Sequence, residues 1–199
     1  MSTTSTALMT AEELMQLPRG YYRAELINGE LITMPLTGLP HGRIALLLGA
    51  TLLQFVLDHE LGQVYSNDAG FQLTRNPDTV LGPDIAFISK ERLNEVGEVR
   101  GYWQGPPDLA VEVSSPGDRP GKVKKKMSRW LSFGTKQVWV VDEKHCTITI
   151  YRSESDITTF SGCDYLEAQD LFPGLRISLD RIFGPWQRTV EESTLSQEK

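Results

Sequence analysis

The segment from residue 41 to residue 59 constrains the fold more than any other part of the sequence. Its apolar residues fall at positions 44, 47, 48, 52, 55 and 56, which is the spacing of one face of an α-helix. Such a helix needs a surface to pack on, and the apolar runs 84–89, 108–114 and 137–142 predict strands that supply it. We therefore expect a long amphipathic helix that lies against a β-sheet and ends at Gly62.

The remaining elements are expected on both sides of this helix. Thr10, with Glu13 three residues later, is typical of the N-cap of a short helix. Asn28-Gly29 is typical of a tight hairpin turn between two strands within residues 22–34. A second helix is predicted over 121–133, and further strands over 63–74, 146–151 and 157–161. The expected fold class is α/β (α+β): a mixed central β-sheet flanked by helices, with an N-terminal β-hairpin.

The length of 199 residues is that of one domain, which we place at residues 11–188, between flexible tails at 1–10 and 189–199. The longest apolar stretch, residues 44–57, is shorter than the roughly 20 residues that cross a bilayer. The polar N-terminal segment lacks the apolar run of a secretory signal. Cys146 and Cys163 fit no metal or redox spacing. We expect a cytoplasmic protein without a membrane span.

Charge is distributed unevenly along the chain. The formal net charge is −6, which argues against a broad basic surface for nucleic acid. The window 119–129 nevertheless holds six basic residues and no acid. Its outward-facing members are candidate contacts to nucleic acid, namely Arg119, Lys122, Lys125 and Arg129.

Two acidic residues lie in strands that are otherwise apolar. Asp84 opens a predicted strand directly after a proline, and Glu112 lies between two valines in the middle of another. Burial of a bare carboxylate is costly unless a cation or hydrogen bonds meet it, so these two acids mark a candidate site. The alternative is that the second strand lies at a sheet edge, where Glu112 would face water.

The predicted helix 121–133 offers two lysines to such a site. With Val123 at zero and 100° per residue, the apolar stripe runs from about −20° at Trp130 to about 80° at Leu131. Lys126 falls at about −60° and Lys124 at about 100°, so one lies on each border of the stripe and geometry alone does not choose between them. The alternative is that all these lysines form a solvated face.

Two strand-borne acids and a nearby lysine suit metal-assisted cleavage of phosphodiester bonds. Carboxylate oxygens are hard ligands for Mg²⁺, for which Mn²⁺ can substitute. The metal lowers the pKa of a bound water and neutralises charge at phosphorus, while a lysine orients that water or stabilises the developing charge. Asp84 and Glu112 are therefore candidate metal ligands.

The order and spacing of several short segments resemble the PD-(D/E)XK nucleases, and in particular the Uma-type family of predicted bacterial endonucleases. The resemblance spans about residues 10 to 185. The matching segments are Ala24-Glu-Leu-Ile-Asn-Gly-Glu-Leu, Pro40-His41, Gly82-Pro-Asp-Ile, Pro107-Asp-Leu-Ala-Val-Glu-Val-Ser-Ser-Pro, Lys126 with Trp130, and Val138-Trp-Val-Val-Asp142. It implies a restriction endonuclease-like core.

Residue by residue, the resemblance implies Asp84 and Glu112 as metal ligands and adds Glu25 as a further catalytic acid. The lysine of the nuclease motif stands two residues after the second acid, where this chain has Ser114. The family suggests that the lysine has moved to the helix, at Lys126. His41 is a candidate accessory residue, as are Ser114 and Lys124. Glu25 also has a plainer interpretation, as a solvent-facing charge of the hairpin.

The sequence therefore favours a Mg²⁺-dependent endonuclease acting on DNA, as a homodimer that addresses two strands. The acidic net charge and the serine at position 114 support a second hypothesis, a binding module that keeps the nuclease fold with weak or no catalysis. A purely structural role would leave Asp84 and Glu112 unexplained.

Overall fold

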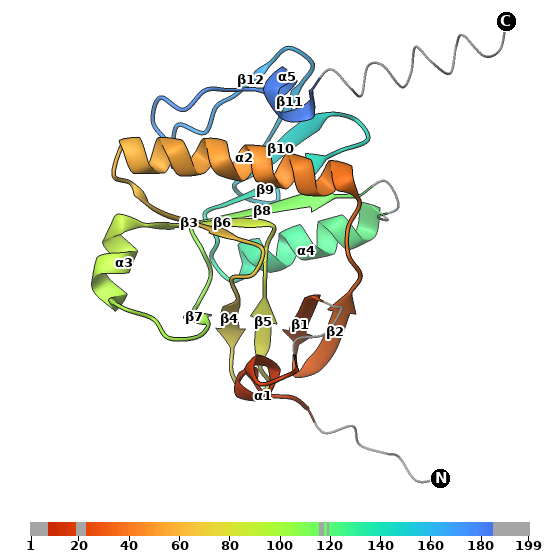
Figure 1. Ribbon diagram of the computed structural model, residues 1–199, viewed down its shortest axis with the longest axis vertical. Coiled ribbons are helices and arrows are strands. Elements are labelled where there is room, and N and C mark those ends of the chain that lie inside the picture. The colour runs from red at the N-terminus through yellow and green to blue at the C-terminus, as the bar shows by residue number, and fades with distance from the viewer. Residues whose placement is uncertain (1–7, 19–22, 116–117, 119, 185–199) are drawn as a thin grey trace, which may run out of the picture.

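The computed structural model describes residues 8–18, 23–115, 118 and 120–184. Within these ranges the chain forms two larger β-sheets, a small two-stranded sheet and five helices (Figure 1). Arg119 and the expected C-terminal tail lie outside the described residues, as do residues 1–7 of the expected N-terminal tail. The extent of the domain and of its tails therefore stays a prediction.

The larger sheet has six strands in the order β11-β10-β9-β8-β6-β3. It is mixed, because β8 and β9 pair in parallel while the other neighbours are antiparallel. The strands β8 and β9 lie in its centre and are almost entirely buried, as their continuous apolar sequence indicates. Its members are β3 (Gly62–Ser66), β6 (Ile85–Ser89), β8 (Leu109–Ser114), β9 (Gln137–Asp142), β10 (Thr147–Tyr151) and β11 (Ile157–Ser161).

The second sheet has five strands in the order β2-β1-β5-β4-β7. It contains the N-terminal hairpin, in which β1 and β2 pair through a turn at Asn28-Gly29. Both turn residues have positive φ, 53° and 78°, as the Asn-Gly pair predicts. Its members are β1 (Arg23–Ile27), β2 (Glu30–Met34), β4 (Phe71–Thr74), β5 (Thr79–Leu81) and β7 (Trp103–Gln104); β12 (Tyr165–Leu166) and β13 (Ile177–Ser178) form the two-stranded sheet.

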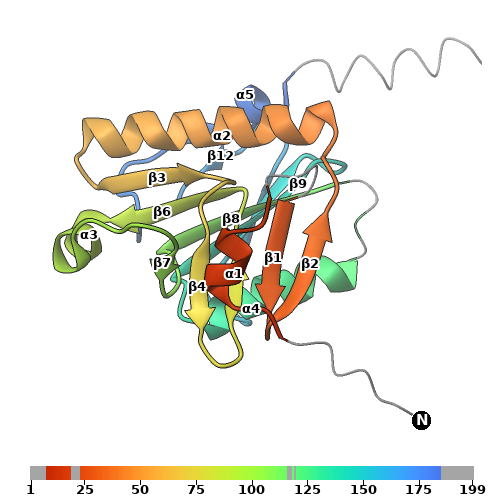
Figure 2. The same cartoon turned by 60° about the horizontal axis from the view of Figure 1, so that its bottom comes forward.

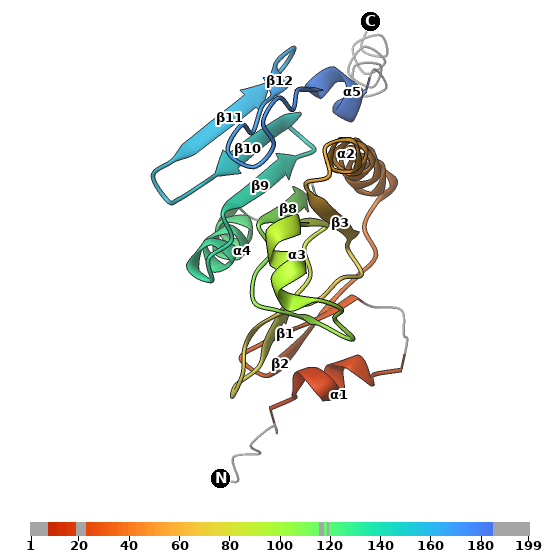
Figure 3. The ribbon, with the colours of Figure 1, turned by 90° about the vertical axis from the view of Figure 1, so that its left-hand side faces the viewer.

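Two helices cover opposite faces of the six-stranded sheet, which is plain in Figure 3. Helix α2 (Leu39–Asp58) lies on one face, and α4 (Pro120–Ser132) lies on the other. The five-stranded sheet extends from the α4 side, and α1 lies beside β1 in Figure 2 and packs on Leu26 of β1 and Val80 of β5. The remaining helices are α1 (Ala11–Met15), α3 (Lys90–Val96) and α5 (Leu179–Phe183).

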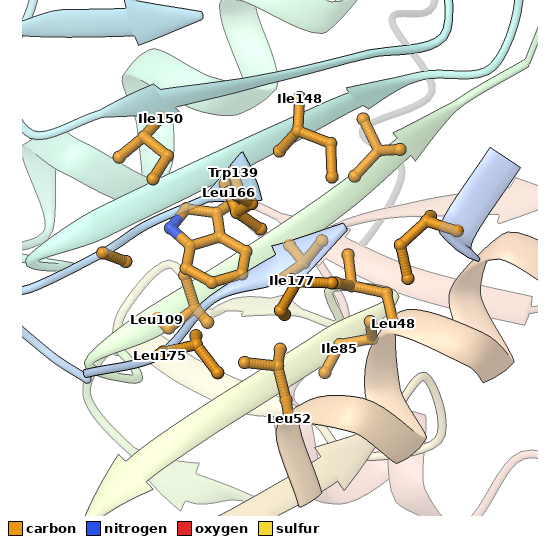
Figure 4. Close-up of a cluster of buried hydrophobic side chains, with 14 of the residues drawn as sticks. Leu48, Leu52, Ile85, Leu109, Trp139, Ile148, Ile150, Leu166, Leu175 and Ile177 are labelled. Carbon is orange, nitrogen blue, oxygen red and sulfur yellow. The ribbon is translucent and has the colours of Figure 1, made fainter. Parts of the chain in front are cut away.

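The main core fills the space between α2 and the six-stranded sheet (Figure 4). Leu48 and Leu52 of α2 meet Ile85 of β6 and Trp139 of β9 there, and all four side chains are almost fully buried. The Trp139 indole N–H donates to Gln137 Oε1 at 2.9 Å, so its polar atom is satisfied inside the core. By length and composition α2 could cross a membrane, but in this fold one face of it packs as a core helix.

A second core fills the other face of the six-stranded sheet. Met127 and Trp130 of α4 pack there on Ala110 of β8 and Val138 of β9, together with Phe71 from the five-stranded sheet. The alternation along β8 thus sends odd-numbered residues toward α2 and even-numbered ones toward α4. Because Glu112 is even-numbered, its side chain faces α4.

The mixed fold flanked by helices, the hairpin and the main helices agree with the sequence-based predictions. The Thr10–Glu13 capping box is present, and the long helix begins two residues earlier than expected, at Leu39. Two details were wrong. The expected strand 63–74 is two strands in different sheets. The long helix ends at Asp58 with His59 as its C-cap, so Gly62 opens β3 instead of ending the helix. A second main sheet of five strands accompanies the mixed central sheet, because the chain leaves the six-stranded sheet after β3 and returns to it at β6.

Candidate active site

Asp84 lies where the chain passes from the five-stranded sheet to the six-stranded sheet, between β5 and β6. Its backbone N–H donates to Val111 O at 2.9 Å, and its Oδ2 accepts the backbone N–H of Val113 at 2.8 Å. Its Oδ1 accepts a hydrogen bond from Arg23 Nη1 at 2.8 Å. Asp84 is therefore buried, and hydrogen bonds to both of its carboxylate oxygens hold it against β8.

Glu112 extends from the centre of β8 toward α4 and is 7% exposed. Its Oε2 accepts a hydrogen bond from Lys126 Nζ at 2.7 Å, and its Oε1 accepts one from the indole Nε1 of Trp130 at 2.7 Å. Because β8 has β6 and β9 as neighbours, the alternative of a sheet edge with Glu112 facing water was wrong. Glu112 is therefore a buried carboxylate that accepts one hydrogen bond from a cationic donor and one from a neutral donor.

Glu25 of β1 joins the same cluster from the hairpin. Its Oε1 lies 3.6 Å from Lys126 Nζ and accepts the backbone N–H of Gly82 at 3.0 Å. Glu25 is 4% exposed, so its interpretation as a solvent-facing hairpin charge was wrong, whereas Glu30 does face solvent. One lysine thus bridges acids from β1 and β8.

The two border lysines of α4 have different surroundings. Lys126 contacts Glu112 and Glu25, while Lys124 is exposed and has no contact to these acids. His41, in the first turn of α2, is buried with Nε2 3.4 Å from Asp84 Oδ2. Ser114 donates from Oγ to Val141 O at 3.1 Å, a contact to the neighbouring strand rather than to the acids.

The other basic residues of α4 lie apart from the acid cluster. Lys122 and Lys125 are exposed, and Arg129 is partly exposed. Lys122 Nζ is 3.2 Å from Asp118 Oδ1, an exposed pair of little energetic weight. The stripe therefore offers solvent-facing positive charge on the same helix that carries Lys126.

Two members of the site were missed by the sequence analysis. Arg23 donates to Asp84, and its Nη2 also donates to the carbonyl oxygens of Gly82 and Pro83, the latter at 2.9 Å. Trp130 was placed in the apolar stripe and in the family resemblance with Lys126, but its role in donating its indole N–H to Glu112 was not predicted. The available signal for Arg23 was its position two residues before Glu25, on the same face of one strand.

The charges of the cluster set its protonation. Burial alone would raise the pKa of Asp84, but the His41 hydrogen bond and the charges of Arg23 and Lys126 outweigh it and hold that pKa well below its usual range. Burial alone would lower the pKa of Lys126, yet the charges of Glu112 and Glu25 keep it above its ordinary value. Asp84 is therefore ionised and Lys126 protonated at neutral pH.

Glu112 carries the cost of burial in this cluster. Desolvation raises its pKa to about 7; the Lys126 charge acts in the opposite direction, and the charges of Asp84 and Glu25 add to the rise. For His41, burial lowers the pKa, but its hydrogen bond to Asp84 and that residue's charge outweigh this, so the pKa is raised. An added cation beside Glu112 would lower its pKa and favour the carboxylate.

The donor set of the cluster fits a hard divalent cation. Each carboxylate oxygen has two lone-pair sites, so the hydrogen bonds at Asp84 and Glu112 leave acceptor capacity for a metal. Mg²⁺ is commonly held by one or two carboxylates and completes its shell with water and substrate phosphate. In the part of the chain that the structure describes, no three acidic, histidine or cysteine side chains form a ready-made metal cage.

The chain is similar to known proteins both in sequence and in fold. A family model described as "Putative restriction endonuclease" (Uma2) matches residues 11–180. Among solved structures, the chain is similar to the crystal structure of a "putative nuclease belonging to DUF820" from Anabaena variabilis ATCC 29413. The identity is 23%, the match covers 88% of this chain and 97% of that chain, and the TM-score is 0.74, so this likeness supports the fold. No curated protein matches the chain.

Proposed function

Because the chain belongs to the Uma2 restriction endonuclease family, we propose that it is a Mg²⁺-dependent endonuclease that hydrolyses DNA phosphodiester bonds. The observation that carries the proposal is the cluster in which Lys126 Nζ contacts Glu112 at 2.7 Å and Glu25 at 3.6 Å, beside the buried Asp84. Charged side chains are almost never fully buried without a partner, and buried carboxylates with shifted pKa values are candidates for functional sites.

In this proposal each residue has a distinct role. Asp84 and Glu112 hold the metal, which supplies an activated water and neutralises charge at the phosphate. Lys126 keeps its proton and stabilises the negative charge that develops at the phosphate oxygens. Trp130 orients Glu112, and Glu25 orients Lys126 while it holds the backbone of Gly82.

The partners follow from the same surfaces. Lys122, Lys125 and Arg129 of α4 are proposed to contact the DNA backbone. Arg119, which precedes them in the sequence, is proposed to do the same. Ser114 and Lys124 are assigned no catalytic step, and His41 acts through its contact to Asp84. A homodimer would present two such sites to two strands, and a cytoplasmic location is proposed.

A binding module with the nuclease fold is the second candidate. Ser114 stands where the nuclease motif has its lysine, and the formal net charge is −6. If Lys126 serves only to neutralise Glu112 and Glu25, the protein would bind nucleic acid without cleaving it.

The test is cleavage of supercoiled plasmid DNA by the purified protein with Mg²⁺ or Mn²⁺. The variants Glu112→Gln and Lys126→Ala run in parallel, and both are expected to lose cleavage. Lys124→Ala is the matched variant on the opposite border of the same helix, and it decides between the two lysines because it is exposed and remote from the acids. We expect it to cleave like the parent.

The outcomes separate the candidates. Loss of cleavage in Glu112→Gln and Lys126→Ala, with Lys124→Ala active, supports the nuclease. Equal cleavage by all variants would point to a contaminating nuclease. Metal-independent DNA binding by a parent that cleaves nothing would favour the binding module.

A further inference from the structure

A cavity of about 540 Å³ adjoins the candidate active site on the α2 side. Arg23, His41 and Asp84 line it. Asp84 is one of the proposed metal ligands, and Arg23 and His41 contact it. The rest of its wall comes from residues 35–37, from α2 and from β3. The metal site and this cavity therefore share a boundary, and a molecule bound in one would be adjacent to the other.

The part of the cavity at Arg23 suits a phosphate group. The contacts of Arg23 to Asp84, Gly82 and Pro83 use Nη1 and Nη2 and account for three of the five N–H donors of a guanidinium. The side chain is 25% exposed and lines the cavity, so its charge is accessible from there. The planar guanidinium of arginine is a typical phosphate-binding group, and its remaining donors can form hydrogen bonds to phosphate oxygens.

The part of the cavity along α2 suits a flat apolar group. From His41 to Leu53 the helix covers about 18 Å at 1.5 Å per residue. Leu46 is 72% exposed and Leu36 is 90% exposed, and both line the cavity. Gly42 and Ala45, which have small side chains, lie on the same stretch of the helix, and Val64 and Tyr65 of β3 also border the cavity. Apolar and aromatic walls of this kind bind extruded nucleobases.

Resting on the proposed function, we infer that this cavity is a subsite for one unpaired nucleotide of the substrate, with its phosphate at Arg23 and its base against the apolar side chains of α2. A base in a duplex is stacked and paired, and it must leave the stack to enter a cavity. The protein therefore prefers single-stranded DNA, or a duplex with an unpaired base next to the cleaved bond.

The test blocks the cavity without touching the acids. A Cβ added at Gly42 meets no atom within 4 Å, and leucine is a better helix former than glycine, so Gly42→Leu fills the cavity in a folded protein. Leu46→Glu, at an exposed position, adds a negative charge that repels phosphate. Gln54→Leu adds the same side chain as the first variant to an exposed site of α2 outside the cavity, and it is the control.

The measurement is fluorescence anisotropy of a labelled 12-nucleotide DNA, as a single strand and as a blunt duplex, with Ca²⁺ in place of Mg²⁺. We expect the parent and Gln54→Leu to bind the single strand about tenfold more tightly than the duplex. In Gly42→Leu and Leu46→Glu the affinity for the single strand should fall about tenfold, to that of the duplex. Because the readout is binding, the inference is tested whether or not the protein cleaves DNA.

Two results would overturn the inference. One is equal affinity of the parent for the two DNA forms, and the other is unchanged single-strand affinity in both cavity variants. Sedimentation velocity of the same proteins identifies the competing explanation: if Leu46→Glu converts a dimer to a monomer and leaves DNA binding intact, the apolar wall contacts a second copy of the chain. Plasmid cleavage that fails while the single-strand preference holds would refute the nuclease and leave the subsite standing.

Discussion

Replacement of Lys126 by methionine removes the only positive charge that contacts Glu112 within the part of the chain that the structure describes. The lysine side chain is 23% exposed, and those of Glu112 and Glu25 are 9% and 6% exposed. Loss of one partner from a buried pair costs about 3–5 kcal/mol, because the other charge is left uncompensated. In a chain of this size, a loss at the lower end of this range, about 3 kcal/mol, lowers the Tm by about 6–12 °C.

The pH dependence follows from Glu112, whose pKa is already raised to about 7. A carboxyl group with a raised pKa in the folded state binds a proton there that the unfolded chain has lost, so stability falls as the pH rises from the unfolded pKa toward the folded one. Without Lys126 the pKa of Glu112 rises further, so this window reaches a higher pH in the variant than in the parent. The free-energy difference between parent and variant should therefore widen by about 1 kcal/mol from pH 6 to pH 8.

Urea denaturation at pH 6 and pH 8 measures this effect. Lys126→Met with Glu112→Gln should recover part of the loss, and Lys124→Met, an exposed control on the same helix, should change stability by less than about 0.5 kcal/mol. Mn²⁺ should stabilise Lys126→Met more than the parent, since a bound cation replaces the missing ammonium group. Equal stability of Lys126→Met and the parent at pH 8 would refute the reasoning.

Three further predictions concern other parts of the molecule. Asp108→Asn should lower stability by about 1–3 kcal/mol at pH 7 by urea denaturation. Burial would raise the pKa of Asp108, but the Lys136 hydrogen bond, the Ser89 N–H and the Arg92 charge outweigh it and lower the pKa, so the parent should lose more stability than the variant as the pH falls below about 4. Trp130→Phe should lower the free energy of unfolding, measured by thermal unfolding, by about 1–3 kcal/mol, because the buried Glu112 loses a hydrogen-bond donor. This role would be contradicted if, in a Glu112→Gln background, Trp130→Phe cost the same as another core tryptophan-to-phenylalanine change. Neutralising Lys122, Lys125 and Arg129 of α4 should weaken DNA binding. The slope of log K against log salt should fall by about 1 for each phosphate that the protein no longer neutralises, and an unchanged slope would exclude this face as the DNA contact.

The elements that the sequence predicted are those with a strong period. Helix α2 and helix α4 each carry an apolar stripe with the helical repeat, and β8 and β9 are continuous apolar runs. Helix α3 was missed because its sequence, Lys-Glu-Arg-Leu-Asn-Glu-Val, has no apolar face and none of its residues is buried. Strands β5 and β7, of three and two residues, are too short to show any period. The division into two sheets depends on pairing between distant strands, which periodicity does not encode.

The candidate site was predictable to the extent that its residues break a pattern. Asp84 and Glu112 interrupt apolar strands, and that is why they could be singled out before the fold was known. The choice of Lys126 over Lys124 needed the placement of α4 on the sheet, because the two lysines border the same stripe. Arg23 breaks no pattern in its strand, and its role depends on the path of residues 82–84 past β1.

The passage of the chain from one sheet to the other at Gly82-Pro83-Asp84 has a consequence for how activity is acquired. The site draws on β1, on this crossing and on β8 and α4, so its charged groups come from residues 23 to 126, about half of the chain. Contacts between residues so far apart in sequence form late in folding, because the closure of long loops must come first. A nascent or partly unfolded chain thus has no assembled set of carboxylates. The proposed nuclease activity would therefore depend on complete folding and would be acquired only once both sheets have docked.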